Sequence, residues 1–268
     1  MNKQIRELLE ESINKLSCIP VELNQLNNLI EVKDILTYTL GLVQPSQEEI
    51  TFDLYKSDPI FFIENCLEIK TPTGRIPFKL YDWQKEFINT AQKQNRIFVK
   101  KPRQVGFTTV QCAYLVWKYL FSENQSIVVI SKNVNHIRDI IYDMLDYCRI
   151  VVVTDTVNKS KISFKGNSID FISDRSIGSG VRGKSFSTIF IDECEFVDSN
   201  IIPCLYPCLH SKGSQFIVGS TSGIYPWTNI LNWHELKVNW DALPNRDVKW
   251  LLNKVRELGV DVVERELM

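Results

Sequence analysis

The sequence predicts an α/β fold in which helices flank a mainly parallel sheet. From about residue 96 onward, short β-branched runs alternate with segments whose apolar residues recur at helical spacing, and no internal repeat or low-complexity tract interrupts this alternation. Such an order is typical of strands joined by helical crossovers. The expected strands are residues 96–100, 126–131, 187–192 and 214–220, and the expected helices between them are 108–121, 134–148 and 200–209.

Two further segments complete the expected architecture. Residues 161–173 hold two alternating strands that meet at Lys165-Gly166-Asn167, which predicts a hairpin. Residues 1–50 carry apolar positions at helical spacing, and acidic residues outnumber basic ones there. We therefore expect N-terminal helices that do not grip DNA.

Composition excludes several classes of protein. The chain has 268 residues, of which 44% are hydrophobic and 24% charged, so it is neither disordered nor fibrous. Its 31 basic and 32 acidic residues give a net charge of −1, which excludes a generally basic nucleic-acid coat protein but not a local basic face. No uncharged apolar run approaches the roughly 18 residues that a membrane span needs, and the N-terminus is charged and amphipathic. We expect a protein that is neither secreted nor in a membrane.

Cysteine usage favours buried, reduced thiols. The seven cysteines are scattered, mostly inside apolar segments. Cys204, Cys208 and His210 form the tightest cluster, but Pro203 and Pro207 interrupt it and no second ligand pair follows. We therefore do not expect a structural metal at this cluster.

The junction between the strand at 96–100 and the next helix has the features of a phosphate site. Residues 101–109, KPRQVGFTT, place Gly106 directly before a helix that begins with two threonines. Backbone N–H groups at such a turn attract phosphate, and a first-turn hydroxyl can bind Mg²⁺. Compared with the Walker A pattern G-x-x-x-x-G-K-[ST], the loop keeps Gly106 and Thr108, but Lys101 replaces the first glycine and Phe107 replaces the lysine.

The missing lysine matters because it supplies positive charge to the β and γ phosphates of a nucleotide. A benzyl side chain at position 107 cannot do this. Lys101 stands at the start of the loop, from where a long side chain could fold over the phosphates, and Arg103 lies in the same loop. The alternative that the residues leave open is an ordinary strand-to-helix turn with solvated charges.

A pair of carboxylates follows the expected strand at 187–192. Asp192 and Glu193 come directly after four apolar or β-branched residues, where carboxylates are costly to bury unless they bind something. The first could hold Mg²⁺ together with Thr108, and the second could orient and activate a water molecule. The alternative is that both acids only cap the following segment. We expect Glu195 to be solvated or ion-paired.

Two weaker signals lie in neighbouring places. The strand at 214–220 ends in Ser220-Thr221-Ser222, at the kind of position where ligands bind in open α/β sheets. These hydroxyls could sense a γ phosphate, and an ordinary turn is the alternative. Gln84 lies in the first turn of an expected helix with Tyr81 nearby, so an amide and an aromatic ring could recognise adenine, with core packing as the alternative.

Taken in order, these motifs resemble the ATPase domain of the large terminase subunit of tailed bacteriophages. The resemblance covers most of residues 51–268 and includes the segment around Gln84, the loop KPRQVGFTT, the basic segment SGVRGKSF at 179–186, the strand IFIDE and the run STS. It implies a P-loop NTPase fold of the ASCE/RecA-like class, with ATP and Mg²⁺ as cofactors. The main departure from the family pattern is Phe107.

The resemblance also implies roles for individual residues. The implied catalytic residues are Lys101, Arg103 and Glu193, the implied Mg²⁺ ligands are Thr108 and Asp192, the implied coupling residues are Ser220, Thr221 and Ser222, and Arg182 is the candidate arginine finger. The further residues implied to contact ATP are Tyr81, Gln84, Pro102, Gln104, Val105, Gly106, Phe107 and Thr109.

Organisation and partners follow from the same resemblance. It implies an N-terminal helical segment at 1–50, an ATPase core at 51–224 and a small lid-like subdomain at 225–268 that leads toward a nuclease domain absent from this chain. We expect no nuclease activity here, because no later acidic cluster could bind two metals. The implied partners are double-stranded DNA, the portal protein of the procapsid, the small terminase subunit, a nuclease domain elsewhere and further copies in a ring, in the cytoplasm of an infected bacterial host.

The sequence therefore predicts an ATP-driven translocase domain that packages viral DNA. A helicase-like ATPase of the same broad fold is one alternative, although the chain has no second RecA-like core. A nucleotide-binding scaffold is the other, since Phe107 occupies the position of the usual lysine.

Overall fold

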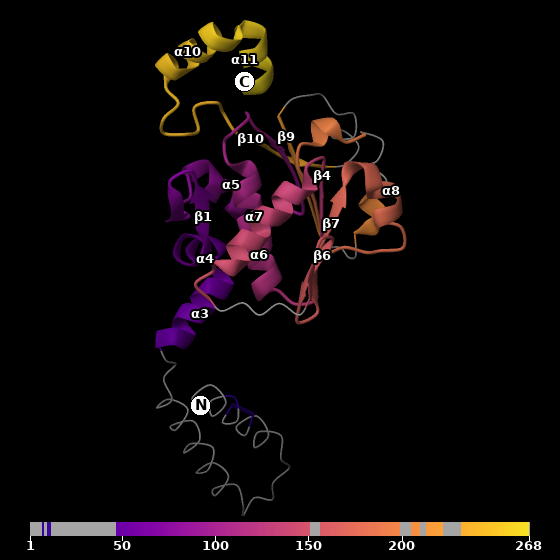
Figure 1. Ribbon diagram of the computed structural model, residues 1–268. Helices are drawn as coiled ribbons and strands as arrows, with labels where there is room; N and C mark the ends of the chain where they lie inside the picture. The colour runs from indigo at the N-terminus through magenta and orange to yellow at the C-terminus, as the bar shows by residue number, and fades with distance from the viewer. Residues whose placement is uncertain are drawn as a thin grey trace, which may run out of the picture. The chain divides into compact units, whose positions relative to one another are not determined.

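The computed structural model divides the chain into two units, Met1–Ser57 and Asp58–Met268. It describes residues 7, 10, 11, 47–150, 156–198, 205–209, 213–221 and 232–267. In the first unit, helix α3 spans Gln47–Ser57, and most of the N-terminal segment predicted to be helical lies outside the described residues. The second unit carries the sheet and is shown in Figure 1.

An eight-stranded sheet forms the centre of the second unit (Figure 1). Six neighbouring strands run parallel, and the last two are antiparallel. In spatial order the strands are β10 (His234–Lys237), β3 (Arg96–Lys100), β9 (Gln215–Ser220), β8 (Thr188–Ile191), β4 (Ser126–Ser131), β7 (Asn167–Ser173), β6 (Lys161–Phe164) and β5 (Thr156–Asn158). The predicted α/β class with a mainly parallel sheet is confirmed.

The predicted strands and hairpin correspond to observed elements, with four additions. The four expected strands are β3, β4, β8 and β9, and the hairpin at 161–173 is formed by β6 and β7 around Lys165 and Gly166. Sequence analysis missed β5 and β10 of this sheet and a separate two-stranded hairpin at 68–77. Strand β10 pairs in parallel with β3, so part of the segment at 225–268 is a strand of the core sheet.

Helices cover the sheet as the alternation predicts. Near the centre, α6 lies beside α4, α5 and α7. In the described part of the expected helix at 200–209, Leu205 is α-helical and residues 206–208 form a 3₁₀ helix that contains Pro207, a residue without an N–H to donate. The helices are α4 (Pro59–Cys66), α5 (Asp82–Lys93), α6 (Phe107–Phe121), α7 (Val134–Asp146), α8 (Ile177–Gly180), α10 (Val248–Leu258) and α11 (Val260–Leu267).

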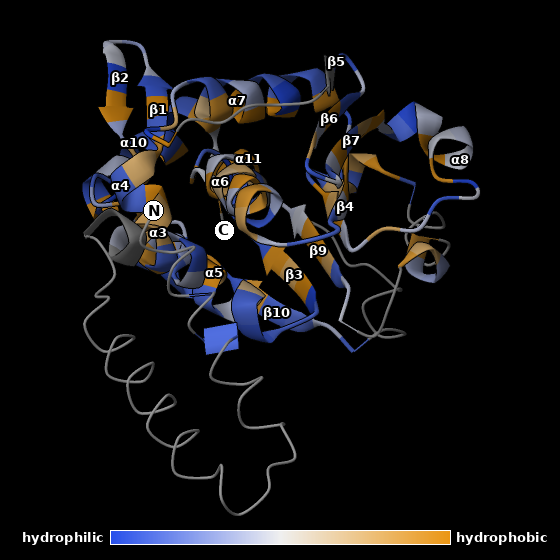
Figure 2. Cartoon of the chain, turned by 90° about the horizontal axis from the view of Figure 1, so that it is seen from below, coloured by the Kyte–Doolittle hydropathy of each residue, from blue (hydrophilic) through white to orange (hydrophobic). Residues whose placement is uncertain are grey.

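The core lies on both faces of the parallel strands, as their apolar sequences require. The four residues of β8 are fully buried, and β3 is mainly hydrophobic in Figure 2. On the other side of α4, a second hairpin pairs β1 (Glu68–Thr71) with β2 (Gly74–Pro77), and Arg75 of this hairpin forms an ion pair with Asp143 of α7.

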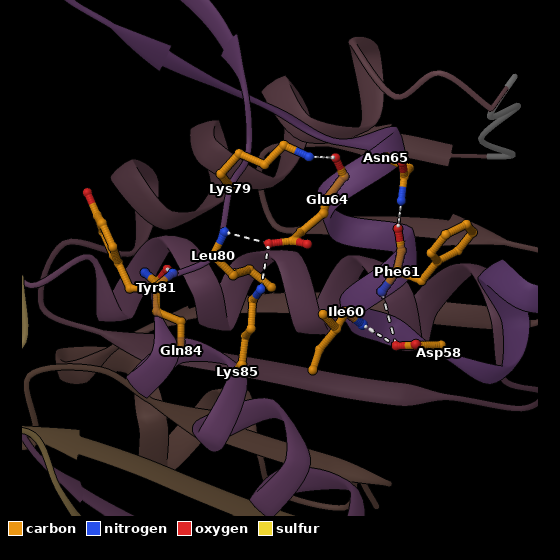
Figure 3. A network of polar contacts seen from close by, with 10 residues as sticks. All are labelled: Asp58, Ile60, Phe61, Glu64, Asn65, Lys79, Leu80, Tyr81, Gln84 and Lys85. Carbon is orange, nitrogen blue, oxygen red and sulfur yellow. Dashed lines mark hydrogen bonds and ion pairs between the residues drawn. The ribbon is translucent and has the colours of Figure 1, made fainter.

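Helix α4 is fixed at both ends by the polar network of Figure 3. Asp58 caps the helix by accepting from the N–H groups of Ile60 and Phe61 at 2.9 and 3.0 Å. Glu64 accepts from the N–H of Leu80 at 3.1 Å and pairs with Lys85 of α5 at 3.2 Å. These contacts hold α4 against the start of α5, the helix that carries Gln84.

The described residues include no helix that is long and apolar enough to cross a membrane. Nor do the described positions contain a group of three or more His, Cys, Asp or Glu residues that could hold a metal ion. Cys66, Cys112 and Cys194 are buried and form no disulfide with another described residue. Cys204 and His210 lie outside the described residues.

A partly buried lysine lies near the amino ends of β8 and β9. Lys118 of α6 donates to Thr188 Oγ1 at 2.7 Å and to Gln215 Oε1 at 2.8 Å. Burial disfavours its charged form and lowers the pKa of Lys118 from 10.5 to about 8. In the folded protein this amine therefore loses its proton at a lower pH than in the unfolded chain.

We predict that this shift makes stability depend on pH. Between about pH 8 and pH 10.5 the unfolded chain holds a proton on Lys118 that the folded chain has lost, so the free energy of unfolding rises with pH. Relative to Lys118→Met, the wild type should gain up to about 1.4 kcal/mol per pH unit in this window. Urea unfolding from pH 7 to 10.5 measures the difference, with exposed Lys93→Met as the control. A difference that stays constant with pH would contradict the shifted pKa.

Candidate active site

Three of the predicted motifs meet at the carboxyl ends of β3, β9 and β8. These strands are parallel neighbours in that order, so the segments that follow them emerge at one edge of the sheet. Lys100 pairs in register with Ser220, and the next N–H, that of Lys101, donates to the Ser220 carbonyl at 3.0 Å. Residues 101–109, the candidate phosphate loop, therefore begin directly beside the end of β9.

The phosphate loop turns sharply before α6. Gly106 has φ +82° and is the N-cap of α6, a left-handed conformation that glycine adopts without strain. Gln104 also has a positive φ, 59°, which is uncommon for a residue with a side chain. The loop thus leads into the amino end of a 15-residue helix, where N–H groups and the helix dipole favour an anion.

Phe107 points into the core. Its ring is fully buried and makes edge-to-face contacts with Phe87 and Phe190, at centroid distances of 5.4 and 6.1 Å. It lies so close to β9 that a Cβ on Gly219 would be 2.2 Å from Phe107 Cε1. The position of the usual Walker A lysine is therefore a packing position between α5, β8 and β9.

Lys101 lies beside the acidic pair. Only 9% of Lys101 is exposed, and its ammonium is 5.7 Å from the centroid of the Phe107 ring. Its positive charge acts on both Asp192 and Glu193, since it opposes the rise of both pKa values. The structure thus brings together the loop-start lysine and the two carboxylates.

Asp192 is bonded to the first turn of α6. Its Oδ2 accepts from Thr108 Oγ1 at 2.5 Å, and its Oδ1 accepts from the N–H of Glu193 at 3.0 Å. Asp192 is only 3% exposed, and this burial raises its pKa against the opposing effects of Lys101 and Thr108. A carboxylate and a hydroxyl in contact offer the oxygen ligands that Mg²⁺ prefers, so the donor set fits this ion.

Glu193 is less buried and more strained than its neighbour. Its backbone is left-handed, with φ 51°. Burial, Asp192 and Glu195 raise the pKa of Glu193, while Lys101 and Arg103 lower it. This carboxylate therefore lies in a field of both signs, with part of its surface open to solvent.

Glu195 has a contact that sequence analysis missed. Its Oε2 accepts from Ser220 Oγ at 2.9 Å and from the Thr221 N–H at 3.4 Å. The expectation of a solvated or ion-paired side chain is corrected: Glu195 joins the acidic segment to the end of β9. Its spacing, three residues after Asp192, is the signal that could have suggested it. Ser222 lies outside the described residues.

Gln84 is bonded inside the protein. It is 1% exposed, its Oε1 accepts from the Tyr81 N–H at 3.0 Å, and its Nε2 donates to the Gly106 carbonyl at 3.3 Å. It therefore ties α5 to the phosphate loop, while Tyr81 is 41% exposed. Contact of either residue with adenine stays a prediction.

Three other predicted residues have different surroundings. The exposed Arg103 forms an ion pair with Glu266 of α11, and its N–H donates to the Glu266 carbonyl at 2.9 Å. Thr109 lines a separate cavity of about 430 Å³ with His136 and others. Arg182 is exposed and lies in the chain between α8 and β8.

A family model covers the centre of this site. Residues 98–202 match the model described as the terminase large subunit, T4likevirus-type, N-terminal. This range contains the phosphate loop, β8 and the acidic pair. Residues 98–202 are therefore similar to the N-terminal part of terminase large subunits.

Solved terminases have the same fold. The HK97 bacteriophage large terminase matches with a TM-score of 0.59 and 18% identity, over 79% of this chain and 54% of that chain. The ATPase domain of the Thermus phage P74-26 large terminase matches with a TM-score of 0.55 and 11% identity, over 71% of this chain and 93% of that chain. A thermophilic-bacteriophage large terminase in complex with ADP matches with a TM-score of 0.56 and 15% identity, over 70% of this chain and 52% of that chain. The chain thus spans about half the length of the whole large terminases that it matches.

Because Phe107 is buried in the core, we predict that the lysine of the Walker A pattern cannot be accommodated at this position. Phe107→Lys should lower the free energy of unfolding by about 3 kcal/mol or more, since an ammonium would replace a packed ring. Phe107→Leu, the control, should cost less, because it stays apolar. Urea unfolding compares the two. A Phe107→Lys variant as stable as Phe107→Leu, with tighter ATP binding, would overturn the packing role.

Proposed function

We propose that this chain is the ATP-hydrolysing motor domain of a viral DNA-packaging terminase. The observation that carries the proposal is the meeting of Lys101, Thr108, Asp192 and Glu193 at one edge of a parallel sheet. A phosphate loop, a hydroxyl bonded to a buried carboxylate and a second, more accessible carboxylate are the groups that phosphoryl transfer to water needs. The family match and the solved terminases with ADP and with ATP-γ-S support ATP as the nucleotide.

In this proposal each group has a distinct task. The N–H groups of the loop and the Lys101 ammonium bind the phosphates and balance their charge. Thr108 and Asp192 would hold Mg²⁺, which supplies charge neutralisation at the phosphate oxygens when it is bound. Glu193 accepts a hydrogen bond from the attacking water and orients it. Since Phe107 takes no part, its apolar side chain does not by itself make the site inactive.

The bond between Glu195 and Ser220 offers a route from hydrolysis to motion. It connects the segment that carries Glu193 with the end of β9, where Ser220, Thr221 and Ser222 are the proposed coupling residues. A change in charge at the phosphates would alter the field on these carboxylates and so the bond to β9. The proposal assigns Glu195 to coupling, not to the chemical step.

A stretch of the chain with many exposed basic residues, 156–187, supports double-stranded DNA as the substrate of the motor. Over residues 156–187 the six basic residues exceed the two acidic ones, Asp170 and Asp174, by four, so the rest of the chain, at −1 − 4, carries −5. The basic residues are exposed, and Asp170 is buried between Lys161 and Lys184. Packaging must ignore sequence, so phosphate contacts would dominate. The six are Lys159, Lys161, Lys165, Arg175, Arg182 and Lys184.

The remaining partners are proposed from the family alone. They are the portal protein of the procapsid, the small terminase subunit, a nuclease domain and further copies of this chain in a ring, in which Arg182 would be the arginine finger of a neighbouring site. A neighbour's arginine would stabilise the developing charge and speed hydrolysis. We therefore expect the highest turnover in the assembled motor.

ATP turnover should depend on Lys101 and Glu193. We expect Lys101→Ala and Glu193→Gln each to lower kcat/KM at least about 100-fold, because each removes a group that acts on the phosphates or on the attacking water. Phosphate release is measured with and without duplex DNA and procapsid components. The matched controls, Lys100→Ala and Glu235→Gln, remove a rim ion pair on β3 and β10 and should keep wild-type turnover. If the wild type is no faster than Glu193→Gln under every condition, the scaffold alternative holds instead.

DNA affinity should depend on the exposed basic residues of 156–187 and on the salt concentration. The triple variant Lys159→Gln, Lys165→Gln and Arg175→Gln should bind duplex DNA more weakly and lower the slope of log K against log salt by about 1 for each residue that contacts a phosphate. Fluorescence anisotropy over a salt series measures this slope. The control replaces three exposed basic residues elsewhere, Lys93, Lys249 and Arg256, by Gln. Equal slopes in the two variants would place the DNA on another surface.

A further inference from the structure

A buried arginine from the C-terminal segment donates hydrogen bonds to two carbonyls of the phosphate loop. Arg246 lies between β10 and α10 and is 7% exposed. Its Nη2 donates to the carbonyls of Arg103 and Gln104 at 3.0 and 3.1 Å. The guanidinium lies 4.7 Å from the centroid of the Trp250 ring, which stacks on Trp240 at 6.4 Å with an interplanar angle of 4°.

Burial removes the Arg246 guanidinium from water, and no carboxylate of the described residues pairs with it. Burial lowers the pKa of Arg246, and among the described residues no carboxylate forms an ion pair with it. A buried guanidinium is tolerated only when its donors are satisfied, and here two loop carbonyls accept from it. The contact between segment 240–250 and the loop therefore combines a buried charge, aromatic stacking and hydrogen bonds.

The direction of these two carbonyls fixes the direction of the N–H groups that follow them. The chain has no cis peptide among its described residues, and in a trans peptide the carbonyl and the following N–H point in opposite directions. Because the carbonyls of residues 103 and 104 face Arg246, the N–H groups of Gln104 and Val105 face away from it. Gln104 and Gly106 both have a left-handed backbone. Such residues turn successive N–H groups toward one concave site, called a nest, that binds anions.

We propose that Arg246 is a positioning residue of the phosphate loop. By holding two carbonyls behind the loop, it orients the Gln104 and Val105 N–H groups toward the phosphates of a nucleoside triphosphate. The identity of the ligand rests on the proposed function, whereas the ordering of the loop does not. A shift of segment 240–250 would release these carbonyls and weaken nucleotide binding, so the C-terminal segment and the nucleotide affect each other's positions.

Two measurements on the full chain test this role. Hydrogen–deuterium exchange reports the order of the loop amides at 103–106 without nucleotide, with the amides of buried β4 as internal reference. Titration with a fluorescent ATP analogue reports affinity. In Arg246→Gln we expect loop exchange to rise about tenfold relative to β4, and the analogue to bind about tenfold or more weakly, since two hydrogen bonds from a charged donor are lost. Arg246→Lys keeps a cation without the planar fork and should recover part of both effects.

The control is Arg256→Gln, which removes an exposed arginine from α10 of the same segment. It should match the wild type in both measurements. The proposal is overturned if Arg246→Gln matches Arg256→Gln, or if its exchange rises as much in β4 as in the loop, which is the result that general destabilisation gives. If Arg246→Gln does not fold, Arg246→Lys is judged by the same comparison. Failure of the wild type to bind the analogue overturns the proposed function, and loop exchange still decides the role of Arg246.

Discussion

The hydrogen bond between Thr108 and Asp192 exists because β3, β9 and β8 run parallel side by side. Parallel strands release their following segments at the same edge, so two residues 84 positions apart come into contact. The same order places the end of β9 between the loop and the acidic pair, where Lys101 and Glu195 both contact Ser220 or its carbonyl. Each proposed role at this site depends on that strand order.

Packing explains why the loop at 101–109 carries phenylalanine where the Walker A pattern has lysine. The Phe107 ring fills the space between Phe87, Phe190 and Gly219, and the absence of a side chain at Gly219 is what admits it. Lys101, at the start of the loop, carries a positive charge that acts on both carboxylates. In the proposed mechanism Lys101 supplies the charge that a Walker A lysine would supply, while position 107 serves packing.

The C-terminal segment is part of the site as well as of the sheet. β10 extends the sheet beside β3, Arg246 holds the loop carbonyls and Glu266 pairs with Arg103. Sequence analysis found none of these contacts, because β10 is short and polar, with three of its four residues exposed, and because residues 246 and 266 lie far along the chain from the loop. An arginine that binds carbonyls has no local pattern that would distinguish it from a surface arginine.

The sequence alone determined those elements whose form depends on residues close together in the chain. Strands β3, β4, β8 and β9, the hairpin of β6 and β7, the loop around Gly106 and the acidic pair all follow from periodicity, turn residues and the cost of burying charge. The tertiary structure alone decided that Phe107 is a core residue, that Glu195 reaches Ser220 and that Arg246 donates to two loop carbonyls. These are contacts between segments distant in sequence, and their energies depend on burial and direction, which are defined only once the sheet has brought those segments together.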